Sequence, residues 1–183
     1  MCGFVGFTGH VENDERVLKA MMDRIVHRGP DMGGTHIKDG VALGFRRLSI
    51  LDLTEAGAQP MGNEDGSVFV VFNGEIYNFQ ELRAELHCDA DTEVLVHGYE
   101  EWGEGLVDRL RGMYGFVVHD MRSGKLFGAR DIFGIKPFYY YQTADGDLLF
   151  GSEIKSFLEH PGFEKAVNKK ALRPYLTMQF PAT

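Results

Sequence analysis

Short β-rich runs joined by tight turns recur along most of this chain and decide its fold class. Ser123-Gly124 and Asp145-Gly146 separate neighbouring runs and are typical of β-hairpins. The runs occupy residues 4–8, 35–38, 41–50, 67–72, 112–120, 125–129, 137–142 and 148–151. Hairpins join antiparallel strands, and the helical segments come in separate groups between the runs. The pattern therefore predicts an α+β fold with mainly antiparallel sheets.

Helical periodicity accounts for the segments between these runs. Asn13 or Asp14 can cap a first helix, and Gly29-Pro30 is expected to end it. Its apolar stripe consists of Val17, Leu18, Met21, Met22 and Ile25. Further helices are expected at residues 79–86, 91–102, 106–110, 153–159 and 168–176.

Composition is that of a globular protein that acts on a small molecule. Apolar residues make up 44% and charged residues 25% of the 183 residues, so an ordinary core is expected. The net charge of −8, without a run of lysine or arginine, argues against nucleic acid and against an anionic membrane surface as partners. No apolar stretch approaches the roughly 20 residues that span a bilayer. Cys2 and Cys88 are the two cysteines, and no signal peptide is evident, so we expect a reduced, cytoplasmic protein.

The cysteine at position 2 can combine a nucleophile and a base in one residue. Removal of Met1 would give Cys2 a free α-amino group beside its thiol. An α-amino group titrates near about 7.7–8.0, close to working pH, so it can accept the thiol proton without a histidine. The alternative is that Cys2 packs as a small hydrophobe, as single cysteines usually do.

The dipeptide Asn73-Gly74 follows a strand-like run and has two interpretations. Asn-Gly is the favoured two-residue hairpin turn. Alternatively, the Asn73 amide and the Gly74 backbone N–H can point together at a developing oxyanion, where each donor contributes about 3 kcal/mol. The local sequence leaves both interpretations open.

Charged residues at two further places can bind an amino-acid substrate. Arg46 and Arg47 lie beside an apolar strand, where alternation sends neighbouring side chains to opposite faces. One of them can therefore face a site and hold a carboxylate, although a surface salt bridge is the competing interpretation. Asp91 begins a helical pattern, so it is either an N-cap or a group that binds a substrate ammonium.

Metal and nucleotide sites have no support in the sequence. The seven histidines are scattered, without the HExxH or paired CxxC spacing of metal sites. The glycine-rich phosphate-binding patterns are absent as well. We therefore expect no metal and no cofactor.

Ordered motifs run through nearly the whole chain. They are Met1-Cys2-Gly3, His27-Arg28-Gly29-Pro30-Asp31, Arg47-Leu48-Ser49-Ile50, Asn73-Gly74-Glu75-Ile76-Tyr77-Asn78, Asp91-Thr92-Glu93, Arg130-Asp131, Gly134-Ile135-Lys136-Pro137 and Ser152-Glu153-Ile154-Lys155. Together they resemble the glutaminase domain of asparagine synthetase, a class II glutamine amidotransferase of the N-terminal nucleophile (Ntn) hydrolase type. The resemblance implies a four-layer αββα sandwich with two mainly antiparallel sheets.

The resemblance also implies roles for the candidate catalytic residues. Cys2 would attack the side-chain amide of glutamine while its α-amino group takes and returns the proton. Asn73 and Gly74 would form the oxyanion hole. Glutamate would be released after hydrolysis of a cysteine thioester, and ammonia would pass to a second active site.

Substrate binding is implied at the two charged ends of glutamine. Arg47 would bind the α-carboxylate, and Glu75 with Asp91 would receive the α-ammonium. The backbone that lines the pocket would belong to Leu48, Ser49, Ile50 and Leu51.

The family's organisation gives the expected domains and partners. Residues 1–160 would form the amidotransferase domain, and residues 161–183 a C-terminal extension that starts a missing synthetase domain. ATP and magnesium are expected only in that second domain. The expected partners are L-glutamine, the synthetase domain and a second copy in a homodimer, with no nucleic acid and no membrane. Two alternatives stay open: an amidotransferase domain that feeds a different ammonia acceptor, and a non-catalytic domain that binds glutamine.

Overall fold

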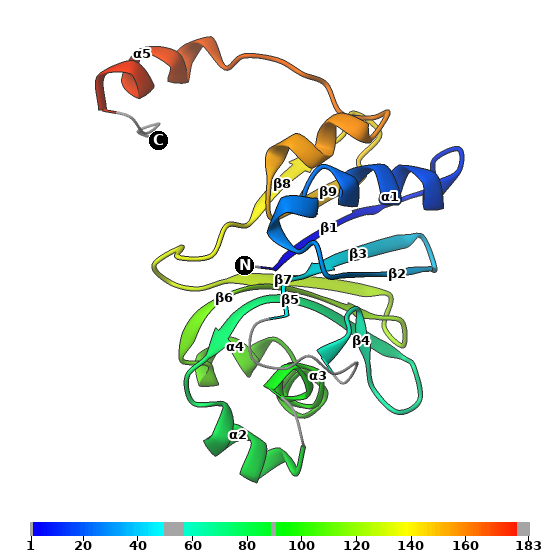
Figure 1. Ribbon diagram of the computed structural model, residues 1–183, viewed down its shortest axis with the longest axis vertical. Helices are drawn as coiled ribbons and strands as arrows, with labels where there is room; N and C mark the ends of the chain where they lie inside the picture. Colours follow the sequence, from blue (N-terminus) through cyan, green and yellow to red (C-terminus); the bar gives the residue numbers. More distant parts are fainter. Residues whose placement is uncertain (1, 50–56, 89–90, 179–183) are drawn as a thin grey trace.

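Two antiparallel sheets stack face to face at the centre of the structure (Figure 1). The computed structural model describes residues 2–49, 57–88 and 91–178. The first sheet has the order β2-β3-β1-β9-β8, and the second has the order β4-β5-β6-β7. Their bounds are β1 (Gly3–Thr8), β2 (Met32–Lys38), β3 (Val41–Arg47), β4 (Met61–Gly62), β5 (Val68–Ile76), β6 (Gly112–Asp120), β7 (Lys125–Arg130), β8 (Tyr139–Gln142) and β9 (Leu148–Gly151).

Helices cover the outer face of each sheet. Against the first sheet lie α1 (Asp14–Asp23) and the 3₁₀ helix η4 (Ile154–Glu159). Against the second lie α2 (Phe79–Leu86), α3 (Asp91–Trp102) and α4 (Leu106–Arg109). The remaining helical segments are η1 (Val26–Arg28), η3 (Gly103–Gly105) and α5 (Lys169–Met178). The predicted α+β class and four-layer αββα sandwich are therefore confirmed.

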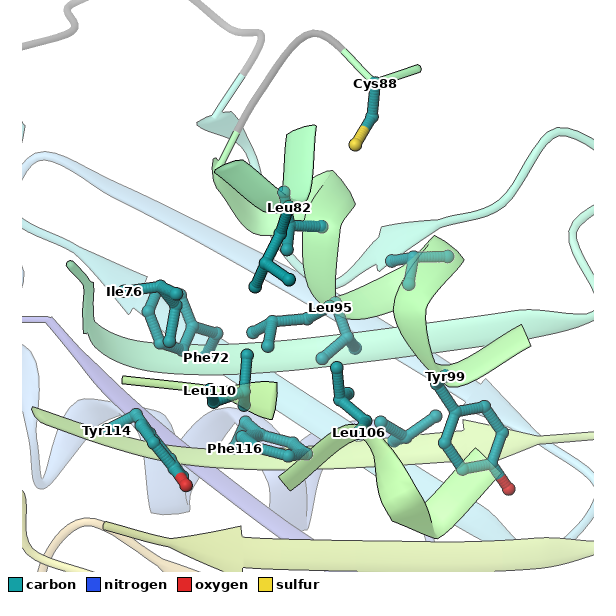
Figure 2. Close-up of a cluster of buried hydrophobic side chains, with 14 of the residues drawn as sticks. Phe72, Ile76, Leu82, Cys88, Leu95, Tyr99, Leu106, Leu110, Tyr114 and Phe116 are labelled. Carbon is teal, nitrogen blue, oxygen red and sulfur yellow. The ribbon is translucent and has the colours of Figure 1, made fainter. Parts of the chain in front are cut away.

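Alternation along the strands divides the apolar residues among three cores. On β1, Phe4 faces the second sheet, whereas Val5 and Phe7 face α1. The layer between the sheets, called here the inter-sheet core, contains buried residues of both sheets: Phe4, Val41, Leu43, Phe45, Val71, Val117 and Phe150. Figure 2 shows the core on the other face of the second sheet, where Leu95 and Leu106 pack over Phe72 and Phe116. Each fully buried side chain of this size stabilises the fold by about 1.5–3 kcal/mol.

The first helix forms as expected but ends earlier. Asn13 caps it by accepting the backbone N–H of Arg16 at 3.1 Å. The helix stops at Asp23 and a 3₁₀ turn follows before Gly29. At Gly29 the chain passes so close to β3 that a Cβ would lie 2.4 Å from the main-chain carbon of Arg46. A glycine is needed there for that close approach.

Of the two interpretations of Asn73-Gly74, the hairpin turn is wrong. Strand β5 continues through Asn73 and Gly74 to Ile76, paired with β6 in one unbroken register. Local Asn-Gly chemistry favours a turn, but the long partner strand supplies a continuous ladder. Asn73 pairs with Gly115 of β6, so it is a strand residue and not part of a turn.

Other expected elements agree with the structure apart from their ends. The turns at Gly124 and Gly146 have φ of +66° and +94°, as hairpin glycines do. Strand β2 begins at residue 32 instead of 35, β3 ends at 47, and the short strand β4 was not predicted. The segment after residue 160 leads to α5, which stands apart from the four layers in Figure 1. The domain boundary near residue 160 stays a prediction. None of the helices in the described ranges is long and apolar enough to span a membrane.

Candidate active site

Cys2 lies at the start of β1 with its half-buried side chain against the inter-sheet core. Its sulfur accepts the backbone N–H of Leu48 at 3.4 Å and lies 3.7 Å from the Leu48 carbonyl oxygen, to which the thiol can donate. The register of β1 with β3 pairs Gly3 with Arg46, so Cys2 stands opposite Arg47. The predicted nucleophile is thus held beside the segment predicted to line the substrate pocket.

The two neighbouring arginines point to opposite faces of the first sheet, as alternation predicts. Arg46 turns to the α1 side, where it donates to the Met22 carbonyl and pairs with Asp23. Arg47 is buried on the inter-sheet side, and its Nη1 lies 3.7 Å from the sulfur of Met32. Arg46 therefore forms the surface ion pair, with Asp23, and Arg47 is the arginine that shares a face of the first sheet with Cys2.

Asn73 is a buried amide whose donor is unsatisfied. Its side chain is 3% exposed, and Nδ2 has no hydrogen-bond partner among the described residues. On β5, Val68, Val70 and Phe72 face the helices. Since β5 alternates, Asn73 faces the inter-sheet core with Val71. Most buried donors find a partner, so an orphaned one calls for an explanation such as a ligand.

Asn73 and Cys2 lie near the same part of the inter-sheet core. Strands β1 and β5 contact each other across this core. A Cβ on Gly115, the register partner of Asn73, would lie 3.7 Å from the ring of Phe4. Phe4 follows Cys2 by two residues and shares its face of β1. Asn73 therefore lies in the part of the inter-sheet core that adjoins Phe4.

Gly74 is a position at which no larger residue fits. A Cβ there would lie 2.3 Å from the carbonyl oxygen of Met113 and 2.7 Å from the Cα of Tyr114. Glycine thus lets β5 and β6 approach closely at this point. The backbone of Gly74 lies directly after the orphaned amide, as an oxyanion hole built from both groups would require.

The other predicted binding residues are placed to different extents. Glu75 is exposed and is two residues beyond Asn73, on the same face of β5. Leu48 and Ser49 are half-buried, and the Ser49 N–H donates to Asp31 at 2.8 Å. Asp91 is the first residue of α3, but its side chain is outside the described part. Ile50 and Leu51 also lie outside the described residues. The roles of all these residues stay predictions.

Sequence reasoning quoted Arg28 and Glu153 in motifs but gave them no role. The Arg28 Nε donates to the Cys2 carbonyl oxygen at 3.1 Å, and Arg28 Nη1 donates to Glu153 at 3.1 Å. Ser152, beside Glu153, is fully buried and accepts the Phe4 N–H at 3.0 Å. The sequence indicated a role for Arg28 and Glu153 only by placing both in motifs of the family pattern. Nothing in the local sequence around either residue shows that the two side chains contact each other.

The carboxylate of Glu153 is kept ionised by a group of hydrogen-bond donors. Burial alone would raise the pKa of Glu153, but hydrogen bonds from Lys155, Arg28 and His27 outweigh it and lower the pKa. His27 lies 2.8 Å and Lys155 3.1 Å from its oxygens. A hollow of about 350 Å³ lined by Arg28, Glu153 and Lys155, among others, opens beside this cluster.

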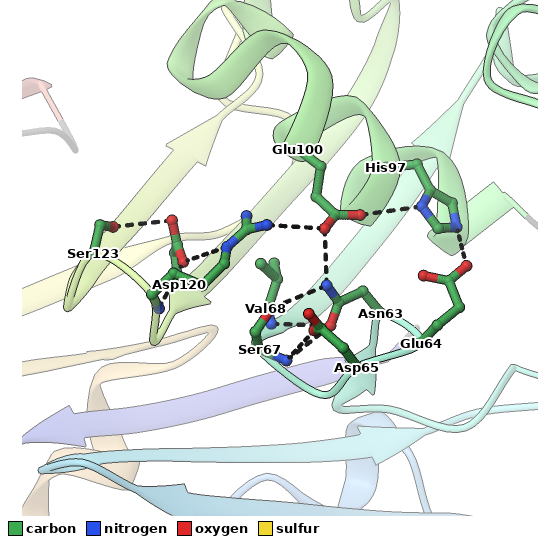
Figure 3. A network of polar contacts seen from close by, with 10 residues as sticks. Asn63, Glu64, Asp65, Ser67, Val68, His97, Glu100, Asp120 and Ser123 are labelled. Carbon is green, nitrogen blue, oxygen red and sulfur yellow. Dashed lines mark hydrogen bonds and ion pairs between the residues drawn. The ribbon is translucent and has the colours of Figure 1, made fainter.

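One group with metal-like spacing lies elsewhere in the described structure. Glu64, His97 and Glu100 place their ligand atoms within 4.8 Å of one another. The same Glu100 also accepts from Asn63, as Figure 3 shows, and from Arg122 at 3.2 Å. These ion pairs and hydrogen bonds tie α3 to the turn before β5, so we interpret the group as a structural network.

Comparison with known proteins identifies the family. The family model described as "Glutamine amidotransferase domain" matches residues 1–183. Asparagine synthetase [glutamine-hydrolyzing] 1 of Bacillus subtilis (strain 168) is 43% identical, over 98% of this chain and 30% of its own length. The corresponding protein 2 of that organism is 46% identical over 93% of this chain and 24% of its own length. The Zea mays asparagine synthetase [glutamine-hydrolyzing] is 42% identical over 85% and 28% of the two chains.

A solved structure agrees with the fold. Glutamine phosphoribosylpyrophosphate amidotransferase from B. subtilis, complexed with ADP and GMP, superposes with a TM-score of 0.72 at 20% identity. The match covers 85% of this chain and 43% of that one. The chain spans about 24–30% of the length of the three curated relatives named above. With its family model matched from end to end, this chain belongs to the glutamine amidotransferase domain family.

Proposed function

We propose that this domain hydrolyses L-glutamine to glutamate and ammonia through a thioester on Cys2. The observation that carries the proposal is the orphaned amide of Asn73, which β5 turns toward the inter-sheet core against which the Cys2 thiol packs. A buried donor without a partner costs about 1–3 kcal/mol of stability. This loss of stability has a functional explanation if the donor stabilises an oxyanion that forms only during the reaction.

The reaction begins with proton transfer within Cys2. Once Met1 is removed, the α-amino group takes the thiol proton, and the thiolate attacks the side-chain amide carbon of glutamine. The carbonyl oxygen becomes an oxyanion, which accepts hydrogen bonds from Asn73 Nδ2 and the Gly74 N–H. The tetrahedral intermediate collapses, the carbon–nitrogen bond breaks, and ammonia leaves with the proton from the α-amino group. Water then attacks the thioester through a second oxyanion, and glutamate is released.

Substrate recognition uses the charges at both ends of glutamine. Arg47 offers a planar fork that binds the α-carboxylate in two parallel hydrogen bonds. Glu75 and Asp91 supply the negative charge for the α-ammonium. The burial of Arg47 on the inter-sheet side supports this assignment, because an ion pair with a carboxylate is stronger there than at an exposed surface. The backbone from Leu48 to Leu51 would line the pocket.

The fate of the ammonia is proposed from the longer relatives. Three of them are named glutamine-hydrolysing asparagine synthetases, and this chain covers under a third of each. We infer that ammonia passes to a synthetase domain of the same protein, which uses ATP and magnesium to amidate aspartate. Residues 161–183 would begin that domain. A homodimer and a cytoplasmic location stay predictions.

The test measures glutamate formed from glutamine by the protein with its amino terminus identified by mass spectrometry. The Cys2→Ala variant is the control, because it keeps the chain end but lacks the nucleophile. Glutamate release above this control is expected only from protein that has lost Met1. Glutamine binding without turnover would instead identify a non-catalytic glutamine-binding domain and overturn the proposal.

A further inference from the structure

We propose that Glu153 is a positioning residue for the nucleophile and acts through Arg28. The inference rests on the proposed function, because it takes Cys2 as the nucleophile. It adds a residue about 150 positions away in the sequence that sets how Cys2 is presented.

Cys2 depends on side-chain contacts because it precedes the first strand. The ladder of β1 begins at Gly3, so the backbone of Cys2 lies outside it. Chain ends fray unless they are tied down. Thiol and α-amino base belong to one residue, so the torsions of Cys2 decide whether the base reaches the thiol and the thiol reaches the substrate.

Arg28 fixes the backbone of Cys2 by a hydrogen bond. Its Nε donates to the Cys2 carbonyl oxygen at 3.1 Å, and its side chain is 12% exposed. Its stem packs so tightly over Gly3 that a Cβ there would lie 2.9 Å from Arg28 Cδ. The carbonyl of Cys2 and the backbone of Gly3 are therefore both fixed by one arginine side chain.

Glu153 in turn fixes the guanidinium. Its Oε1 accepts Arg28 Nη1 at 3.1 Å, while Arg28 Nη2 is buried without a partner in the described part of the chain. Within that part, Glu153 is thus the carboxylate that orients this guanidinium. Removing its charge leaves a largely buried cation without a counter-charge, and such a cation moves toward solvent. The hollow of about 350 Å³ beside Arg28 gives it room to do so.

Glu153 itself is held in place through its neighbour Ser152. Ser152 precedes it and forms two hydrogen bonds with Phe4, one from the Phe4 N–H to Oγ at 3.0 Å and one from the Ser152 N–H to the Phe4 carbonyl at 2.8 Å. Ser152 therefore holds the chain at Phe4 through these hydrogen bonds. Arg28, paired with Glu153, holds it at Cys2. Ser152 and Glu153 both belong to the segment between β9 and η4, whereas Arg28 belongs to η1.

The first test compares steady-state glutaminase kinetics of Glu153→Gln with those of Glu159→Gln. Glu159 ends the 3₁₀ helix that directly follows Glu153 and pairs with Arg24, so its variant loses a glutamate–arginine ion pair without touching Arg28. Misplacement of a reacting group by about 1 Å can cost about 100-fold in rate. We expect kcat of Glu153→Gln to fall about tenfold or more with KM for glutamine within about twofold, and Glu159→Gln to match wild type. Equal kcat in the two variants overturns the inference.

The second test asks whether Glu153 acts only through Arg28. Residues that work as a unit give non-additive effects. In an Arg28→Met background, Glu153→Gln should change kcat by less than about twofold. The same loss in both backgrounds overturns the inference. Melting temperatures identify misfolded variants, and if Glu153→Gln is one of them, Glu153→Asp replaces it in both comparisons. A wild-type protein without glutaminase activity refutes the proposed function, whereas an active wild type with an unaffected Glu153→Gln refutes only this inference.

Discussion

Replacing Asn73 with leucine should make the protein more stable and nearly inactive. The Asn73 side chain is 3% exposed, and its Nδ2 has no partner among the described residues. Leucine has a similar branched shape and brings no polar group. An unsatisfied buried donor costs about 1–3 kcal/mol, so its removal should raise the free energy of unfolding by about 1–2 kcal/mol after imperfect packing is allowed for. In a chain of this size that corresponds to a rise in melting temperature of roughly 2–8 °C.

The same change removes a donor from the proposed oxyanion hole. Loss of one such donor lowers kcat by about 100- to 1,000-fold, or about 3–4 kcal/mol of transition-state stabilisation. KM for glutamine should change little, because the hydrogen bond strengthens only when the oxyanion forms. The assay is thermal unfolding together with steady-state glutaminase kinetics on the same preparation.

Asn63 is a matched control for this prediction. Both polar atoms of its side-chain amide are hydrogen-bonded. Nδ2 donates to Ser67 and Glu100 at 3.1 and 2.8 Å, and Oδ1 accepts two backbone N–H groups. Asn63→Leu should therefore destabilise the fold by about 1–3 kcal/mol while kcat of the folded protein stays near wild type. The reasoning is refuted if Asn73→Leu is less stable than wild type by more than about 1 kcal/mol, or keeps kcat within about tenfold.

Three further changes separate binding, strand packing and proton linkage. Arg47→Lys should raise KM for glutamine at least about tenfold because it loses the bidentate fork, whereas Arg46→Lys should leave KM unchanged; steady-state kinetics decides, and equal KM values contradict the assignment. Gly74→Ala should lower the melting temperature, since its Cβ would meet a main-chain oxygen of the neighbouring strand at 2.3 Å; an unchanged melting temperature in thermal unfolding speaks against this clash. Burial lowers the pKa of His36 and His119, so the unfolded chain binds more protons, and stability should be full above about pH 6.5 and fall below it. Urea unfolding at several pH values should show that His119→Gln reduces this fall, and an unchanged slope excludes the linkage.

Period-two alternation made part of this structure predictable. From the strand pattern alone, Arg46 and Arg47 had to point apart, and the structure has them on opposite faces. The buried stripe of α1 was predictable from the helical period instead, since Val17, Leu18 and Met21 recur at helical spacing. Such features depend only on neighbours in sequence.

Long-range pairing could not be read from local chemistry. Asn73-Gly74 has the composition of a turn, but its register with Gly115 and Tyr114 keeps it in a strand. Arg28 and Glu153 are 125 residues apart, so no local pattern reveals their contact. Both cases needed the three-dimensional partner, because pairing energy from a distant strand or charge outweighs a weak local preference.

The candidate site is inseparable from the register of the two sheets. Cys2 directly precedes β1 and lies on the same side as the even-numbered Phe4, whereas Arg47 and Asn73 occupy odd positions of β3 and β5. Cys2 and Arg47 share the inter-sheet side because the β1–β3 pairing sets Gly3 against Arg46, and Asn73 reaches it because it alternates with Phe72 and shares its side with Val71. A shift of β3 by one residue would turn Arg47 outward and bring Arg46 inward together with the wrong set of core side chains. The hydrophobic pattern that buries Leu43 and Phe45 therefore also selects which arginine can face Cys2, so packing and substrate recognition are specified by the same residues of β3.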